Sequence, residues 1–464
     1  MSARRYAIAG GCVVAVAALV RLVAASNEIW LDEVWSLRIA AELGSVWRAF
    51  TIRHDNNHVL NTIYLHWLGL RDAWIVYRLP AVLAGTGAVA AVLLAQRGAR
   101  RADALATATL MALSYPLVLY SAEARGYAPA LLAALVAFYA VERYWETRRL
   151  AALVVFWTAS GLGMLFHATY VPAYVALLGW SAIRAVQIHG VSGRALQALA
   201  TCHLLPLACA VAFSLLFVRG MVIGGGPGYR TLDVVRESTA YALGVPQGWS
   251  AAALAIVVAL TASGLGLLMA ERSPRWSFFL LVLVVVPALM LLTTRPQVLY
   301  FRYFLAQILF FYVLAGTVLG WLAARGATAR VAAWTLVALY VAAQLPPLRA
   351  LLTTGRGGCV ETVRYLGSHT SGPIVHVGSD DDFRNALMLW YLERFLPDGK
   401  RIRYVPRAAA AHPPPDWVLL HDLGPATARP DTIQSPTGTP YERAAGFQCG
   451  GVARWYWWVY RRAG

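Results

Sequence analysis

Apolar residues along this chain fall into long runs that short polar connections separate. About eleven of the runs are long enough for a helix to cross the hydrocarbon core of a bilayer, which takes roughly 20 residues. The predicted spans are residues 6–25, 74–95, 103–120, 127–144, 150–167, 170–186, 198–218, 249–270, 277–294, 303–323 and 330–347. This pattern predicts an α-helical integral membrane protein.

The composition supports this prediction. Of 464 residues, 59% are hydrophobic and only 14% are charged. In soluble domains, about a quarter of the residues are charged. Arginine supplies nearly all of the net charge of +17, because Lys400 is the only lysine. A positive charge of this size is expected if arginines lie in cytoplasmic loops and contact anionic lipid. No basic stretch belongs to a soluble domain of the kind that recognises nucleic acid, so we expect no nucleic-acid partner.

Arginine in the short connections predicts the orientation. With eleven spans, one side of the membrane collects Arg4, Arg101, Arg148, Arg184, Arg272 and Arg325. The positive-inside rule makes that side cytoplasmic. Residues 6–25 are too long for the apolar core of a signal peptide and lack a cleavage site, so they are the first span. An odd number of spans then places the N-terminus in the cytoplasm and the C-terminal tail outside.

Two regions lie outside the predicted spans. The first outer loop, about residues 26–73, has helical periodicity over 33–50 and 57–70, which predicts two helices lying in the membrane interface or packed beneath the loop. The tail forms the second region. We expect a transmembrane domain over residues 1–348 and an extracytoplasmic domain over 349–464.

Strand and helix patterns alternate within the tail. Residues 373–379, 401–405, 417–420 and 455–460 are predicted strands, and residues 383–395 are a predicted helix. This spacing predicts a small α/β domain. Asp380, Asp381 and Asp382 precede the helix, where acidic residues cap a helix N-terminus more often than they bind a metal or a nucleotide sugar. Because the compartment is oxidising, Cys359 and Cys449 are predicted to form a disulfide.

An acidic pair follows directly on the first span. Asp32 and Glu33 stand between Trp30 and Trp35, and tryptophan favours the headgroup region of a membrane. A carboxylate held there can accept a proton from an incoming hydroxyl. Asp32 is therefore the candidate catalytic base and Glu33 its neighbour. The alternative is that both residues form the acidic N-terminus of a helix.

Further polar groups collect on the same predicted face. The candidate phosphate-binding residues are Arg125, Tyr127, Arg302 and Tyr303, and the candidate substrate-binding residues are Asn57, His58, Glu123 and His167. An arginine in an outer turn breaks the charge bias and indicates an anionic ligand, since guanidinium binds phosphate oxygens in bidentate fashion. The alternatives are an ion pair of Arg125 with Glu123, snorkelling arginines, packing histidines and a helix cap at Asn57.

A divalent cation is a weaker possibility. Asp32, Glu33 and His58 supply suitable ligand types, but their spacing is not diagnostic of a metal site. Sugar transfer from a lipid phosphate needs no metal in principle. It needs a base behind the anomeric carbon and positive charge around the leaving phosphate.

The motifs resemble those of the GT-C superfamily of polyprenyl-phosphate-sugar-dependent glycosyltransferases. Within it, the protein O-mannosyltransferase and aminoarabinose transferase branch is most similar. The resemblance covers roughly residues 1–320 and rests on Leu31–Ser36, Asn57–Thr62, Tyr120–Tyr127 and the pair Arg302–Tyr303. It implies that Asp32 is the catalytic base and that Arg125 and Arg302 contact the lipid phosphate. The sequence departs from the family in lacking a lysine in the membrane region.

The resulting hypothesis is an inverting glycosyltransferase of a bacterial cytoplasmic membrane. It would take one sugar from a polyprenyl-phosphate carrier and deliver it, on the extracytoplasmic face, to a hydroxyl of a lipid, glycan or protein. One alternative is a transporter or flippase for an anionic polyprenyl lipid, but transporters place ionisable residues near the bilayer midplane, whereas here they lie at span ends. Another alternative is a non-catalytic subunit of envelope assembly.

Overall fold

The computed structural model describes residues 2–95, 101–224, 229–293, 299–409, 413–423, 429–435 and 438–463. The chain divides into two compact units. The membrane unit comprises Met1–Ala25, Leu43–Leu68 and Val76–Leu348, and the C-terminal unit comprises Ser26–Glu42, Gly69–Ile75 and Arg349–Gly464. In this division two segments of the first outer loop group with the tail.

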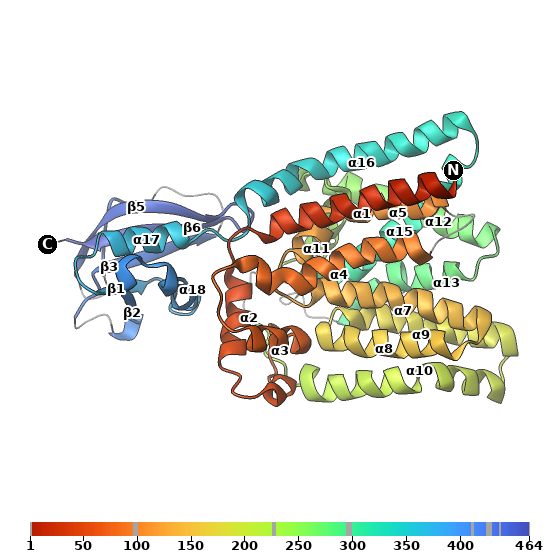
Figure 1. Cartoon of the computed structure of the whole chain (residues 1–464), viewed down its shortest axis with the longest axis horizontal. Helices are drawn as coiled ribbons and strands as arrows, with labels where there is room; N and C mark the ends of the chain where they lie inside the picture. The colour runs from red at the N-terminus through yellow and green to blue at the C-terminus, as the bar shows by residue number, and fades with distance from the viewer. Residues whose placement is uncertain are drawn as a thin grey trace. The chain divides into compact units, whose positions relative to one another are not determined.

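Helices make up the membrane unit (Figure 1). The helices of this unit up to Phe213 are α1 (Ala3–Ala25), η1 (Val46–Phe50), α3 (Val59–Leu68), α4 (Trp74–Ala95), α5 (Arg101–Ala112), α6 (Tyr115–Ser121), α7 (Tyr127–Thr147), α8 (Leu150–Phe166), α9 (Tyr170–His189) and α10 (Gly193–Phe213). The later ones are η2 (Ser214–Val218), α11 (Thr231–Leu243), η3 (Gln247–Trp249), α12 (Ser250–Ala270), α13 (Arg275–Leu280), η4 (Leu281–Val285), α14 (Val286–Thr293), η6 (Phe301–Phe304), α15 (Leu305–Ala323) and α16 (Ala327–Thr354).

Fewer helices qualify as spans than the sequence predicted. Among the described residues, eight helical stretches are long and apolar enough to cross a membrane, or nine if α5 and α6, bent by 63°, form one broken span. The eleven predicted runs are all helical, but α8 has only 17 residues. Helix α7 is largely buried and carries Glu142 and Arg143 in its last two turns, and it is not among the helices that qualify by length and hydropathy.

The break between α5 and α6 is built from local chemistry. Pro116 lies in the first turn of α6, and the Ser114 hydroxyl accepts a hydrogen bond from the Leu117 N–H. The carbonyls of Met111 and Ala112, which the break frees, accept hydrogen bonds from the buried Arg21 guanidinium at 3.2 Å each. Such partners are required because an unpaired carbonyl in a membrane is costly. The bent pair leads directly into the turn that carries Arg125.

The C-terminal unit contains a six-stranded mixed sheet of order β2-β1-β3-β6-β5-β4. Strand β1 pairs in parallel with β2 and β3, and the other pairs are antiparallel. The elements are α2 (Leu31–Ala41), α17 (Val360–Ser368), β1 (Ile374–Ser379), α18 (Arg384–Leu392), η7 (Glu393–Phe395), η8 (Pro397–Gly399), β2 (Arg401–Tyr404), η9 (Arg407–Ala409), β3 (Trp417–Leu423), β4 (Thr432–Gln434), β5 (Pro440–Gly450) and β6 (Trp455–Arg462). The four predicted strands are present, and β4 and β5 were not foreseen.

The two helices predicted in the first outer loop need one correction. The sequence predicted a single helix over residues 33–50, whereas α2 ends at Ala41 and η1 begins at Val46. Gly44 lies between them with φ of +66°, a left-handed conformation that ends a helix. The second predicted helix corresponds to α3.

In the acidic run just before α18, Asp381 caps the helix and Asp380 contacts the sheet. The Asp381 carboxylate accepts hydrogen bonds from the backbone N–H groups of Phe383 and Arg384 at 3.0 and 2.8 Å, which is the predicted helix cap. Asp380 binds the backbone and ring of His421. In the part of the chain that is described, no three His, Cys, Asp or Glu residues gather as a possible metal site.

Candidate functional site

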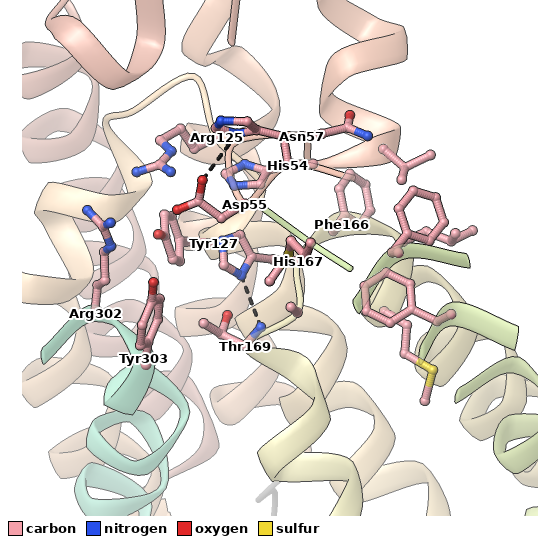
Figure 2. A pocket seen from close by; sticks show the side chains of 18 of the residues that line it. His54, Asp55, Asn57, Arg125, Tyr127, Phe166, His167, Thr169, Arg302 and Tyr303 are labelled. Carbon is pink, nitrogen blue, oxygen red and sulfur yellow. Dashed lines mark hydrogen bonds and ion pairs between the residues drawn. The ribbon is translucent and has the colours of Figure 1, made fainter. Parts of the chain in front are cut away.

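A pocket in the membrane unit brings together side chains from four distant segments (Figure 2). The first outer loop contributes His54, Asp55, Asn57 and His58; the turn before α7 contributes Arg125 and Tyr127; the turn after α8 contributes His167; and η6 contributes Arg302 and Tyr303. The cavity measures about 200 Å³. The segments meet because each joins the end of one apolar helix to the next.

The two guanidinium groups lie on the same side of the pocket (Figure 2). Arg125 is 2% exposed, and its Nη2 donates a hydrogen bond to Asn56 Oδ1 at 2.7 Å. The Arg125 guanidinium lies 5.0 Å from the centre of the Tyr127 ring. The Arg302 guanidinium lies 4.7 and 5.7 Å from the rings of Tyr300 and Tyr303. Stacking on aromatic faces holds both cations in fixed orientations.

Two histidines add uncharged donors. His58 Nδ1 accepts a hydrogen bond from the Gly126 N–H, and His167 Nδ1 accepts one from the Thr169 N–H, each at 3.0 Å. A neutral imidazole whose Nδ1 accepts carries its proton on Nε2. Both Nε2 atoms are buried and have no hydrogen-bond partner among the described residues. The pocket is therefore lined with two N–H donors that a ligand could satisfy.

Packing keeps these imidazoles close together and neutral. The rings of His58 and His167 lie 4.3 Å apart, and His167 stacks on Tyr127 at 3.9 Å. Burial and the positive charges of Arg125 and Arg302 lower the pKa of His167 well below its ordinary value. The same effects, together with His167 itself, lower the pKa of His58.

Asp55 is a pocket residue that the sequence analysis did not select. Its carboxylate lies 3.1 Å from His54 Nδ1 and accepts a hydrogen bond from the Gly224 N–H at 3.0 Å. Burial alone would raise the pKa of Asp55, but these bonds and the charge of Arg125 bring it below its ordinary value. The only sequence signal was its place in the polar run that ends at His58.

Asn57 and Glu123 differ from the other candidates. The Asn57 amide donates to the carbonyls of Ala49 and Ile52 at 2.8 and 2.9 Å and accepts from Thr62 Oγ1 at 2.9 Å. These bonds fix the start of α3, so they favour the structural alternative for Asn57. Glu123 is buried, but it does not line the pocket.

Asp32 and Glu33 belong to the C-terminal unit, in the first turn of α2. Glu33 is fully buried, and its Oε2 accepts a hydrogen bond from the Trp30 N–H at 3.2 Å. Glu33 therefore caps α2, as the alternative proposed. His58 belongs to the membrane unit. Among the described residues, no three His, Cys, Asp or Glu side chains lie close enough together to hold a metal ion, so the structure gives no support to the suggested metal site of Asp32, Glu33 and His58.

Cys359 and Cys449 are buried side by side in the C-terminal unit. Both are free thiols in the structure. The Cys359 sulfur lies 3.8 Å from the Cys449 carbonyl oxygen, and Thr362 Oγ1 lies 3.8 Å from the Cys449 sulfur. The predicted disulfide stays a prediction that this proximity makes testable.

Comparison with known proteins places the fold. No protein-family model matches the sequence, and no curated protein matches it. Among solved structures, ArnT from Cupriavidus metallidurans in the apo state is 14% identical with a TM-score of 0.59, over 91% of this chain and 94% of that one. The chain has the GT-C fold. The Archaeoglobus fulgidus oligosaccharyltransferase in complex with Zn and sulfate is similar too, at 10% identity and a TM-score of 0.54, over 88% of this chain and 67% of that one.

At identities of 10–14%, these matches show the fold of the chain. The resemblance stated from the motifs is thus confirmed at the level of the fold. In this chain, the GT-C fold places Arg125 and Arg302 together with two imidazole donors at the ends of apolar helices. Such a site suits a ligand with an anionic head. Apolar side chains such as Phe166, Phe213 and Phe217 line the rest of the pocket.

Proposed function

We propose that this protein is an inverting glycosyltransferase that moves a single sugar from a polyprenyl-phosphate carrier to an acceptor hydroxyl. The pocket around Arg125 and Arg302 carries the proposal. It combines two guanidinium groups and two Nε2–H donors with an aromatic and aliphatic wall. A polyprenyl phosphate has the matching chemistry of an anion joined to a hydrocarbon chain.

The fold supports this donor class. A crystal structure of ArnT from Cupriavidus metallidurans bound to undecaprenyl phosphate is 13% identical to this chain, with a TM-score of 0.54 over 99% of this chain and 98% of that one. We therefore take undecaprenyl phosphate as the probe of the pocket. The acceptor is a lipid, glycan or protein on the extracytoplasmic face of a bacterial cytoplasmic membrane.

The proposed reaction is a single displacement. Asp32 takes the proton of the acceptor hydroxyl, whose oxygen attacks the anomeric carbon. The bond between that carbon and the phosphate oxygen breaks, and its electron pair stays on the phosphate. Arg125 and Arg302 stabilise the added negative charge, and attack opposite the leaving group inverts the anomeric configuration. The donors on His58 and His167 bind the remaining phosphate oxygens.

Two variants separate binding from chemistry. Asp32→Asn should bind undecaprenyl monophosphate in nanodiscs as the wild type does, yet lose transfer by about 100- to 10,000-fold, the usual cost of removing a positioned base. Arg125→Ala should weaken binding of the same lipid by about 10-fold or more. The control is Arg219→Ala, which removes an exposed arginine of the same unit.

Transfer is measured with radiolabelled undecaprenyl-phosphate hexoses and pentoses and a bacterial membrane lipid extract as acceptor. Full activity of Asp32→Asn would remove the base assignment. Equal lipid affinity in the Arg125→Ala and Arg219→Ala variants would show that the pocket does not bind the phosphate.

A further inference from the structure

The segment that carries Asp32 is tied to residues more than 300 positions away in the chain. The Asn27 amide donates a hydrogen bond to the Leu351 carbonyl at 2.9 Å, and Glu28 Oε2 accepts one from the Val360 N–H at 3.0 Å. The second bond caps the N-terminus of α17. Both contacts lie within the C-terminal unit and fix the backbone a few residues before Asp32.

Helix α2 also packs on α18 in the same unit. The rings of Trp35 and Phe383 meet edge to face at 4.6 Å, and the Arg38 guanidinium lies 4.8 Å from the Trp390 ring. Residues 35 and 38 are three apart, so they share one face of α2. Aromatic and cation–π pairs of this kind define the rotation of a helix about its axis.

The chain approaches α2 through a contact that only glycine permits. A Cβ atom on Gly357 would lie 2.0 Å from the Ile29 carbonyl oxygen and 2.7 Å from that of Glu28. An alanine there must displace the backbone immediately before α2. The neighbouring Gly358 has no such restriction, because its Cβ would lie at an ordinary 3.5 Å from the Cys449 backbone.

We propose that the C-terminal unit positions the catalytic carboxylate: Gly357 and Phe383 are positioning residues that set the place and orientation of Asp32. This inference rests on the proposed function, in which Asp32 receives the acceptor proton. The phosphate-binding donors belong to the membrane unit, whereas the base belongs to the C-terminal unit. The sheet domain thus supports the segment that carries the proposed base.

The proposal predicts that displacing the segment before α2 changes kcat and leaves donor binding unchanged. A misplacement of about 1 Å in a reacting group costs roughly 100-fold in rate. Displacing residues 28–29 or releasing Trp35 should therefore lower kcat. The Arg125 pocket does not include these residues, so the affinity for undecaprenyl monophosphate should stay unchanged.

The test uses the full-length protein in nanodiscs and a matched glycine pair. Gly357→Ala should lower kcat for transfer by about 10- to 100-fold, with unchanged affinity for undecaprenyl monophosphate, and Gly358→Ala should retain wild-type kcat. Hydrogen–deuterium exchange in Leu31–Ala41 should be faster in the Gly357→Ala protein than in the wild type, and unchanged in the Gly358→Ala protein. Phe383→Ala should reproduce the loss, and Phe383→Tyr, which keeps the ring, should restore kcat.

Each outcome bears on one hypothesis. If Gly357→Ala and Phe383→Ala keep full kcat while Asp32→Asn abolishes transfer, the positioning role is wrong and the proposed function stands. Faster exchange in Leu31–Ala41 without a loss of kcat would also overturn the positioning role. If Asp32→Asn itself retains transfer, the proposed function fails, and this inference fails with it.

Discussion

Burial and two guanidinium groups hold the pKa values of His58 and His167 well below the ordinary value, so both imidazoles are neutral. Neutrality matters at the residue scale, because each imidazole then offers one proton on Nε2 and accepts a backbone N–H on Nδ1. The sequence departs from the pattern of the GT-C superfamily, which it resembles, in lacking a lysine in the membrane region. In this chain, two imidazoles supply donors in a pocket that contains no lysine, since Lys400 is the only one in the sequence.

This neutrality makes stability depend on pH. The unfolded histidines take up protons below about pH 6.5, whereas the folded ones resist protonation until the pH falls to their lowered pKa values. Stability is therefore full above about pH 6.5 and declines as the pH drops below it. The apparent melting temperature should fall between about pH 7 and pH 5 by a few degrees, at roughly 2–4 °C per kcal/mol.

A double variant tests the assignment. His58→Gln with His167→Gln should flatten this pH dependence, measured by thermal shift in detergent, while His369→Gln, at an exposed position, should leave it unchanged. An identical pH dependence in the double variant would assign the loss of stability to other groups.

At the scale of elements, the pocket depends on a close crossing between the start of α7 and the end of α8. A Cβ atom on Gly126 would lie 1.9 Å from the Phe166 carbonyl oxygen and 3.2 Å from His58 Cβ. The absence of a side chain at this turn lets both histidines approach Tyr127.

Gly126→Ala should therefore push α8 away and separate the donors. We expect the affinity for undecaprenyl monophosphate to fall by about 10-fold or more, because donors must be held within a fraction of an ångström. The control is Gly161→Ala in α8, where a Cβ would meet nothing within 4 Å. Isothermal titration in nanodiscs compares the two variants. Unchanged affinity in both would mean that the crossing does not shape the site.

At the scale of the whole molecule, the orientation in the membrane determines the chemistry available to the C-terminal unit. If this unit lies outside the cytoplasm, Cys359 and Cys449 meet an oxidising environment. They are buried together and separated by about 90 residues. A disulfide closing a loop of this length stabilises a protein by roughly 4–5 kcal/mol in the chain-entropy description.

Non-reducing mass spectrometry of protein isolated from membranes should find the linked peptide of Cys359 and Cys449. Cys202, buried in α10, should remain a free thiol and serves as the internal control. Cys449→Ser should lower the apparent melting temperature under non-reducing conditions only. Two free thiols in protein protected from reduction would contradict the disulfide and weaken the extracytoplasmic assignment.

The sequence alone determined the elements, because hydropathy and strand periodicity are properties of neighbouring residues. It located the long apolar helices, four of the six strands, the cap at Asp381, and arginines and histidines at helix ends, but it did not predict α11 or α17. Its count of eleven exceeds the eight or nine candidate spans among the described residues, because α7 and α8 do not meet the combined length and hydropathy of a span. Strand β4 has only three residues, and β5 has no regular alternation of buried and exposed positions, so neither gave a comparable signal.

Only the tertiary structure decided which polar residues act together. Asp55, which was not a predicted site residue, lines the pocket, and Glu123, which was one, does not. Glu33 proved to cap a helix, and Asp32 proved to belong to the C-terminal unit. These assignments depend on contacts between segments tens to hundreds of residues apart. No local pattern encodes such contacts, because helix packing and close glycine crossings create them only when the chain is folded.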